Sequence, residues 1–145
     1  AIGELEAGRC VLIFPEGRRT EDGRMARFRG GVLLLARKTN APVVPLAIDG
    51  SWDAWSRHRK LPRLGAAIGM RIGEPIPAEV LGAMEEAEAL EHLKREVEKL
   101  RLEVRGDLRR ATRGAWPKPG VGDVPYWAEQ DAAPSENSPR AEGKD

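Results

Sequence analysis

The residues of this 145-residue chain that could do chemistry lie between positions 16 and 31. Glu16 and Gly17 follow a short apolar run, and an arginine-rich stretch comes next: Arg18, Arg19, Arg24, Arg27 and Arg29. Arginine binds phosphate or carboxylate through paired hydrogen bonds and keeps its charge when water is removed. The glycines at 17, 23, 30 and 31 allow a ligand to approach the backbone closely. This pattern predicts a loop that binds a phosphate or carboxylate; the alternative is a solvated basic loop in which Glu16 pairs with an arginine.

The elements that must position this loop are predicted on either side of it. Residues 11–14 are apolar and partly β-branched, which predicts a strand buried on both faces and ended by Pro15. Residues 30–38 have helical composition, and residues 43–48 predict a second buried strand, with Pro45 at an edge or bulge. A strand, helix and strand in this order predict a βαβ unit with a parallel pair of strands. The loop would then lie at the carboxyl edge of the sheet, where open α/β folds bind ligands.

The rest of the chain predicts one further strand, one long helix and a tail. In residues 66–72, alternation places Ile68, Met70 and Ile72 on one face. Residues 84–108 form a helix whose apolar stripe packs on the sheet: Leu90, Leu93, Val97, Leu100, Val104 and Leu108. From about residue 113 the composition shifts to Pro, Gly, Ser and charge. We therefore expect a folded part over 1–112 and a disordered tail over 113–145.

Several blocks in the same order resemble the 1-acylglycerol-3-phosphate acyltransferase family. They are Phe14–Thr20, Asp22-Gly23, Phe28–Gly31, Leu35-Ala36, Pro42–Ile48, Gly50, Trp55, Pro62-Arg63 and Ile72–Ile76, which together span roughly residues 1–110. The resemblance implies an α/β fold containing part of the sheet of the glycerol-3-phosphate acyltransferases. It also implies transfer of an acyl group from acyl-CoA or acyl-carrier protein to lysophosphatidate, giving phosphatidate, with no metal or tightly bound cofactor.

The resemblance assigns roles to six residues of an acceptor site. Arg19 would bind the acceptor phosphate, Glu16 with Gly17 would hold its glycerol portion, and Pro45 would shape the pocket. Arg18 stands where the family usually has Thr, and Thr20 stands where it often has Ser. Arg18 adds a second cation, so either arginine could make the primary phosphate contact.

The general base of the family is a His with an Asp after four intervening residues, and this chain lacks that pair. His58 is followed at the corresponding position by Arg63, and His92 by Val97. We therefore expect a C-terminal part of the enzyme, inactive in isolation, with no catalytic residue of its own. The alternatives are an acyltransferase for another lysolipid, such as a lyso-ornithine lipid, and a non-catalytic phosphate-binding module.

Composition restricts the remaining possibilities. The formal net charge is +1 and the aromatic residues do not interleave with the arginines, which argues against nucleic-acid binding. The single cysteine, Cys10, is expected to be a small buried side chain. The lipid substrate implies the cytoplasmic face of a membrane, reached peripherally or through an anchor outside this chain. Trp52 and Trp55, beside a basic stretch, could lie at that interface or pack against the sheet edge.

Overall fold

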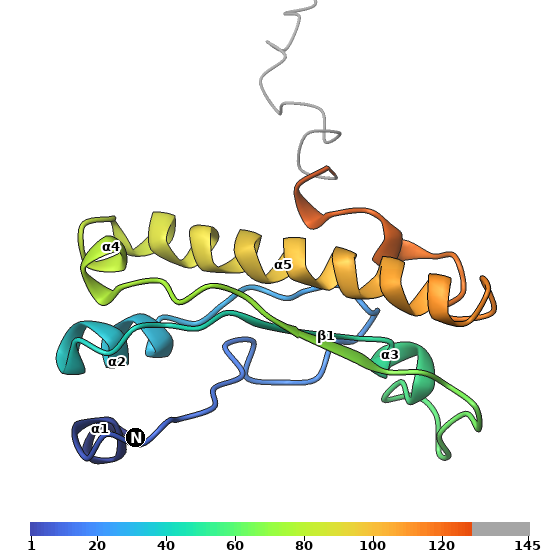
Figure 1. Cartoon of the computed structure of the whole chain (residues 1–145), viewed down its shortest axis with the longest axis horizontal. Helices are drawn as coiled ribbons and strands as arrows, with labels where there is room; N and C mark the ends of the chain where they lie inside the picture. The colour runs from blue at the N-terminus through green and yellow to red at the C-terminus, as the bar shows by residue number, and fades with distance from the viewer. Residues whose placement is uncertain (129–145) are drawn as a thin grey trace, which may run out of the picture.

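A long helix lying along a two-stranded antiparallel sheet forms the centre of the fold in the computed structural model, which describes residues 1–128 (Figure 1). The helix, α5, spans Glu86–Ala111 and agrees with the predicted helix to within a few residues. Its apolar stripe faces inward, with Leu93 and Val104 2% and 3% exposed. A Cβ at Gly69 would lie 2.7 Å from Val104 Cγ1, so the glycine lets α5 approach the sheet closely.

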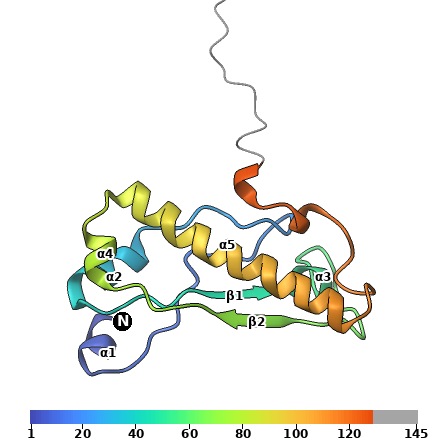
Figure 2. The ribbon, with the colours of Figure 1, turned by 45° about the horizontal axis from the view of Figure 1, so that its top comes forward.

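The two strands lie side by side beneath α5 (Figure 2). β1 spans Leu46–Asp49 and β2 spans Gly69–Ile72, with Leu46 opposite Ile72 and Ile48 opposite Met70. Both are shorter than the predicted strands, and β1 begins directly after Pro45. A single bridge between Val43 and Ile76 continues the pairing beyond the strands. Ile68, Met70 and Ile72 are all more than half exposed, which fits their predicted place on one face, here the face turned away from α5.

The predicted strand at residues 11–14, and with it the parallel βαβ unit, is wrong for residues 1–128. The segment takes no strand pairing there, and Leu12 and Phe14 are 69% and 66% exposed. Cys10, expected to be buried, is exposed. An apolar run becomes a buried strand only when a neighbouring strand takes its backbone hydrogen bonds, and no segment within residues 1–128 does so.

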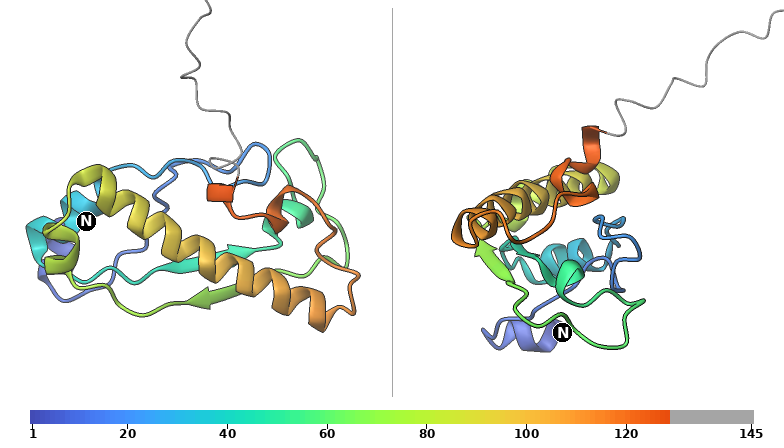
Figure 3. Two further views of the ribbon diagram at one scale, coloured as in Figure 1. Left: turned by 90° about the horizontal axis from the view of Figure 1, so that it is seen from above. Right: turned by 90° about the vertical axis from the view of Figure 1, so that its right-hand side faces the viewer.

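Three short helices close one end of the molecule (Figures 1 and 3). They are α1 (Ile2–Glu6), α2 (Gly31–Thr39) and α4 (Ala78–Gly82). α2 matches the predicted helix and ends at Asn40, which is left-handed with φ 51°. The main core joins α2, α4 and α5 through Phe28, Leu33, Leu81, Ala89 and Leu93.

Residues 113–128 are folded, which corrects the prediction of a disordered tail beginning at 113. Trp116 is 8% exposed, and its Nε1 donates to the Ala67 carbonyl at 3.0 Å. A short 3-10 helix, η1 (Val121–Asp123), then packs beside α5. The composition misled because a few anchors, here Trp116 and Asp123, are enough to hold a Pro- and Gly-rich segment on a helix. The rest of the predicted tail, 129–145, lies outside the described residues.

Candidate anion-binding site

The arginine-rich loop is closed at its base by backbone contacts. The Arg29 amide donates to the Pro15 carbonyl at 3.0 Å, and the Gly17 amide donates to the Phe14 carbonyl at 3.0 Å. Phe28 is 5% exposed and belongs to the core, so the chain is fixed where the loop leads into α2. The intervening residues, 16–27, are therefore presented from a rigid base.

Glu16 braces this loop from inside. Its Oε2 accepts a hydrogen bond from the Ala26 amide at 2.7 Å. Burial raises the pKa of the Glu16 carboxyl above its ordinary value, although the Ala26 amide and Lys94 favour the charged form. The carboxylate assigned to the acceptor glycerol thus already has one structural partner.

Gly17 is required by the backbone and by a close neighbour. Its φ is +69°, in the left-handed region that favours glycine. A Cβ there would lie 2.9 Å from the guanidinium carbon of Arg29. Because no side chain is present at residue 17, Arg29 lies directly against the loop backbone.

The two arginines assigned to phosphate binding differ in their surroundings. Arg18 Nη1 donates to Glu21 Oε1 at 3.0 Å. Arg19 is exposed and has no hydrogen-bond or ion-pair partner among residues 1–128. Arg19 is therefore the guanidinium that a ligand can bind without displacing an existing contact.

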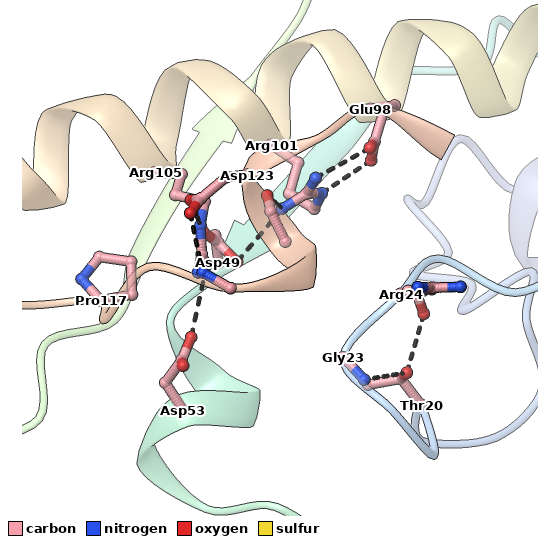
Figure 4. Close-up of polar contacts among 12 residues, drawn as sticks. Thr20, Gly23, Arg24, Asp49, Asp53, Glu98, Arg101, Arg105, Pro117 and Asp123 are labelled. Carbon is pink, nitrogen blue, oxygen red and sulfur yellow. Dashed lines mark hydrogen bonds and ion pairs between the residues drawn. The ribbon is translucent and has the colours of Figure 1, made fainter. Parts of the chain in front are cut away.

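Thr20 uses its hydroxyl to close a turn (Figure 4). The hydroxyl donates to the Arg24 carbonyl at 2.8 Å and accepts from the Gly23 amide at 2.9 Å. The hydroxyl that sequence reasoning assigned to the substrate thus holds the tip of the loop in shape.

A second segment, residues 51–64, begins with the short helix α3 (Ser51–Ala54), continues as a loop and packs against this turn. Trp52 lies against Gly23, and a Cβ at residue 23 would be 2.7 Å from the indole Cδ1. Arg57 Nη1 donates to Glu21 Oε1 at 3.1 Å, and His58 Nε2 lies 3.3 Å from the Glu21 carbonyl. Sequence reasoning missed Glu21 and Arg57 as members of the site, because they are 36 positions apart and no periodic signal connects them.

The alternatives for Trp52 and Trp55 divide between the two residues. Trp52 is half-buried, but it packs against Gly23 and meets His58 edge-to-face at 6.1 Å, contacts other than the predicted one with the sheet edge. Trp55 is 51% exposed, with its Nε1 donating to the Arg59 carbonyl at 3.0 Å. Only Trp55 is thus available at the surface.

Pro45 is placed on a different surface from the loop. It is buried and lines a groove of about 580 Å³ between β2 and α5, which none of residues 16–20 lines. His92 lines the same groove, as do Glu96 and Glu103. Within residues 1–128 neither histidine forms an ion pair with a carboxylate, so the structure reveals no His–carboxylate pair in this part of the chain.

A buried ionic network lies between α5, the end of β1 and the segment 113–128 (Figure 4). Arg105 pairs with Asp49 at 3.0 Å, Asp53 at 3.3 Å and Asp123 at 2.7 Å. Arg101 forms two hydrogen bonds with Glu98, at 2.7 and 2.8 Å. The sequence signal for this network was the four-residue spacing of Arg101, Arg105 and Arg109, which places them on one face of a helix.

Residues 1–128 contain no cluster of three His, Cys, Asp or Glu side chains arranged to hold a metal ion. None of the helices in this range has the length and apolar character needed to cross a membrane.

A family model described as Acyltransferase matches residues 2–49, the segment that carries the loop and α2. Three relatives are named 1-acyl-sn-glycerol-3-phosphate acyltransferases. The chloroplast protein of Brassica napus is 43% identical over 47 residues, which is 32% of this chain and 14% of that protein. The Cocos nucifera protein is 36% identical over 46% of this chain and 21% of its own length. The alpha protein of Homo sapiens is 31% identical over 49% and 25%.

One solved structure is similar over most of the chain. It is the 1-acyl-sn-glycerophosphate acyltransferase PlsC from Thermotoga maritima, with a TM-score of 0.55 and 26% identity. The similarity covers 81% of this chain and 44% of PlsC. The chain thus spans less than half of PlsC and a quarter or less of the three relatives named above.

Proposed function

We propose that this chain, whose residues 2–49 match an acyltransferase family model, forms the acceptor-binding part of a 1-acylglycerol-3-phosphate acyltransferase. In the proposed reaction the sn-2 hydroxyl of lysophosphatidate attacks the carbonyl carbon of an acyl thioester. The new ester bond forms as the carbon–sulfur bond breaks, and the hydroxyl proton passes through a base to the departing thiolate of CoA or acyl-carrier protein. The products are phosphatidate and a free thiol.

The observation that carries this proposal is the presentation of Arg19. The loop is closed at its base, Gly17 brings the backbone to the surface, and Arg19 has no partner among residues 1–128. A phosphate monoester is the kind of ligand that such a guanidinium binds best, through two charge-assisted hydrogen bonds. The neighbouring Arg18 adds a second positive charge to the same loop.

The chain contributes binding and not proton transfer in this proposal. Neither His58 nor His92 has an aspartate after four intervening residues, and Glu16 is occupied by the Ala26 amide. The 145-residue chain alone should therefore transfer no acyl group from acyl-CoA to lysophosphatidate. Turnover by the isolated chain at a rate comparable to that of a complete enzyme would contradict this division of roles.

A binding experiment on the purified chain tests the acceptor assignment. Short-chain lysophosphatidate should bind, whereas the matching monoacylglycerol, which lacks the phosphate, should not. Equal affinity for both ligands, measured by calorimetry, would remove the phosphate from the recognition. Tighter binding of a lyso-ornithine lipid than of lysophosphatidate would instead support the alternative acceptor.

The remaining alternative is a phosphate-binding module that supports no catalysis. It is favoured by the same absence of a His–Asp pair within the 145 residues. The natural gene product that contains this chain separates the two possibilities. Phosphatidate formation by that product supports the enzyme, and phosphate-ester binding without turnover supports the module.

We place the working protein at the cytoplasmic face of a membrane, because the proposed acceptor and product are lipids. Trp55 is 51% exposed in a loop that also carries Arg57, Arg59 and Lys60, a combination suited to an anionic bilayer surface. Co-sedimentation of the chain with phosphatidylglycerol vesicles tests this placement. Trp55→Ala should reduce the bound fraction, and unchanged binding would rule out a role for Trp55.

A further inference from the structure

The arginine-rich loop and the segment 51–64 meet at Glu21. The His58 ring lies against the Glu21 carbonyl, and Trp52 connects His58 to Gly23. These contacts hold the backbone of the two loops together independently of the Glu21 carboxylate. The side chain that carries this carboxylate is 55% exposed.

One oxygen of this carboxylate holds two arginines that are distant in the sequence. Glu21 Oε1 accepts from Arg18 Nη1 at 3.0 Å and from Arg57 Nη1 at 3.1 Å. The two nitrogens can therefore be no more than about 6 Å apart, because both bind the same atom. Two guanidinium groups at this separation are spaced to hold one anion between them.

We propose that Glu21 occupies the position that a phosphate monoester takes between Arg18 and Arg57. Arg57 is then a further phosphate-binding residue, and Glu21 is an internal competitor that leaves when the ligand enters. This inference rests on the proposed function, because it extends the same acceptor site to a residue outside the arginine-rich loop.

The chemistry of the exchange favours the ligand. A phosphate monoester carries up to two negative charges and three free oxygens, whereas the Glu21 carboxylate carries one charge and two oxygens. Each guanidinium can form paired hydrogen bonds with a phosphate, but here each shares a single carboxylate oxygen. The Glu21 ion pairs are about half exposed, and ion pairs so exposed contribute little to stability, so they are easily displaced.

The competing interpretation treats Glu21 as a structural clamp between the loops. The two interpretations predict opposite effects of removing the carboxylate charge. Glu21→Gln should tighten phosphate binding if Glu21 competes with the ligand, and should weaken it if Glu21 holds Arg18 and Arg57 in place.

The experiment measures the dissociation constants of inorganic phosphate, sn-glycerol 3-phosphate and short-chain lysophosphatidate for the purified chain by calorimetry. We expect Glu21→Gln to tighten all three by about threefold or more and Arg57→Ala to weaken all three by about fivefold or more. Arg57→Lys should recover part of the loss, because it retains the charge without the paired geometry. Arg110→Ala, a matched loss of charge from an exposed position on α5, should leave the constants unchanged.

The ligand series and the variants separate the possible failures. Weaker binding by Glu21→Gln, or unchanged binding by Arg57→Ala, overturns the inference while lysophosphatidate binding by the unaltered chain still supports the proposed function. Absence of binding of all three ligands to the unaltered chain overturns both. Binding that is equal for inorganic phosphate and lysophosphatidate identifies a general phosphate site, and stronger binding of lysophosphatidate identifies the lipid acceptor.

Discussion

The indole ring of Trp52 lies so close to Gly23 that a Cβ at residue 23 would be 2.7 Å from its Cδ1. Gly23 has a φ of +90°, and its amide donates to the Thr20 hydroxyl. Gly23 therefore forms the turn of the arginine-rich loop and also leaves room for Trp52 of the neighbouring segment to pack against it. The proposed acceptor site depends on this contact, because Trp52 and His58 hold the two loops together.

Gly23→Ala should destabilise the chain and weaken phosphate binding. The left-handed backbone costs a non-glycine residue about 1 kcal/mol or more, and the clash with Trp52 adds to that cost. Gly65→Ala is a matched control, since Gly65 has a φ of +76° with nothing within 4 Å of the new Cβ. Urea unfolding should show a larger decrease in the free energy of unfolding for Gly23→Ala than for Gly65→Ala. Equal decreases would mean that the Trp52 contact does not add to the cost of the substitution.

Arg19→Ala should reduce the affinity for lysophosphatidate more than any other single change in the loop. Loss of a charge-assisted phosphate contact costs about 1.5–3 kcal/mol, a tenfold or larger rise in the dissociation constant. Arg27→Ala removes one charge from the same loop and should have a smaller effect. Calorimetry on both variants checks this, and an equal effect would reduce the role of Arg19 to general charge.

Asp123→Asn should destabilise the attachment of residues 113–128 at neutral pH. Burial alone would raise the pKa of Asp123, but its ion pairs with Arg109 and Arg105 outweigh burial and hold the pKa well below the ordinary value. The charged form thus stabilises the fold above about pH 3.8, and that stability is lost as the pH falls through the lower folded-state pKa. Denaturant unfolding should show a decrease in the free energy of unfolding of about 1.5–3 kcal/mol at pH 7, and a smaller decrease in acid.

Asp107→Asn provides the control for that experiment. Asp107 pairs with Arg71 and Arg110, but its side chain is 43% exposed, whereas that of Asp123 is 27% exposed. Exposed ion pairs contribute about 0–1 kcal/mol, so this variant should unfold at nearly the same denaturant concentration as the unaltered chain. A loss as large as that of Asp123→Asn would mean that burial does not distinguish the two.

Glu16→Gln should stabilise the chain relative to the unaltered chain, and this gain should be larger at neutral pH than in acid. Because burial raises the folded-state pKa of Glu16, the protonated carboxyl favours folding below about pH 4.5, and this contribution is lost as the pH rises through the folded-state pKa. Glutamine retains an oxygen for the Ala26 amide and carries no charge. Thermal unfolding across pH 3–7 should show a difference in melting temperature between Glu16→Gln and the unaltered chain that increases with pH. A constant difference, or the same difference for the exposed Glu6→Gln, would contradict the burial of Glu16.

The helices were largely predictable because their signals are local. The apolar stripe of α5 recurs at helical spacing, and α2 ends where Asn40 takes a left-handed conformation. The irregular conformation of residues 11–14 could not be predicted, because the apolar run has the composition of a strand but finds no pairing partner within residues 1–128. The folding of residues 113–128 could not be predicted either, because only two residues, Trp116 and Asp123, anchor a stretch that otherwise has the composition of a loop.

The sequence alone determined the chemical character of residues 16–31: a stretch with the arginines and glycines that phosphate binding requires, in a chain without a His–Asp pair. The tertiary structure alone decided that Arg19, unlike Arg18, lacks a partner among residues 1–128, that Thr20 closes a turn, and that Arg57 joins Arg18 at Glu21. Residue type defines what a side chain can bind. Its availability depends on neighbours brought close by folding, and a contact between residues 36 positions apart leaves no periodic mark in a sequence.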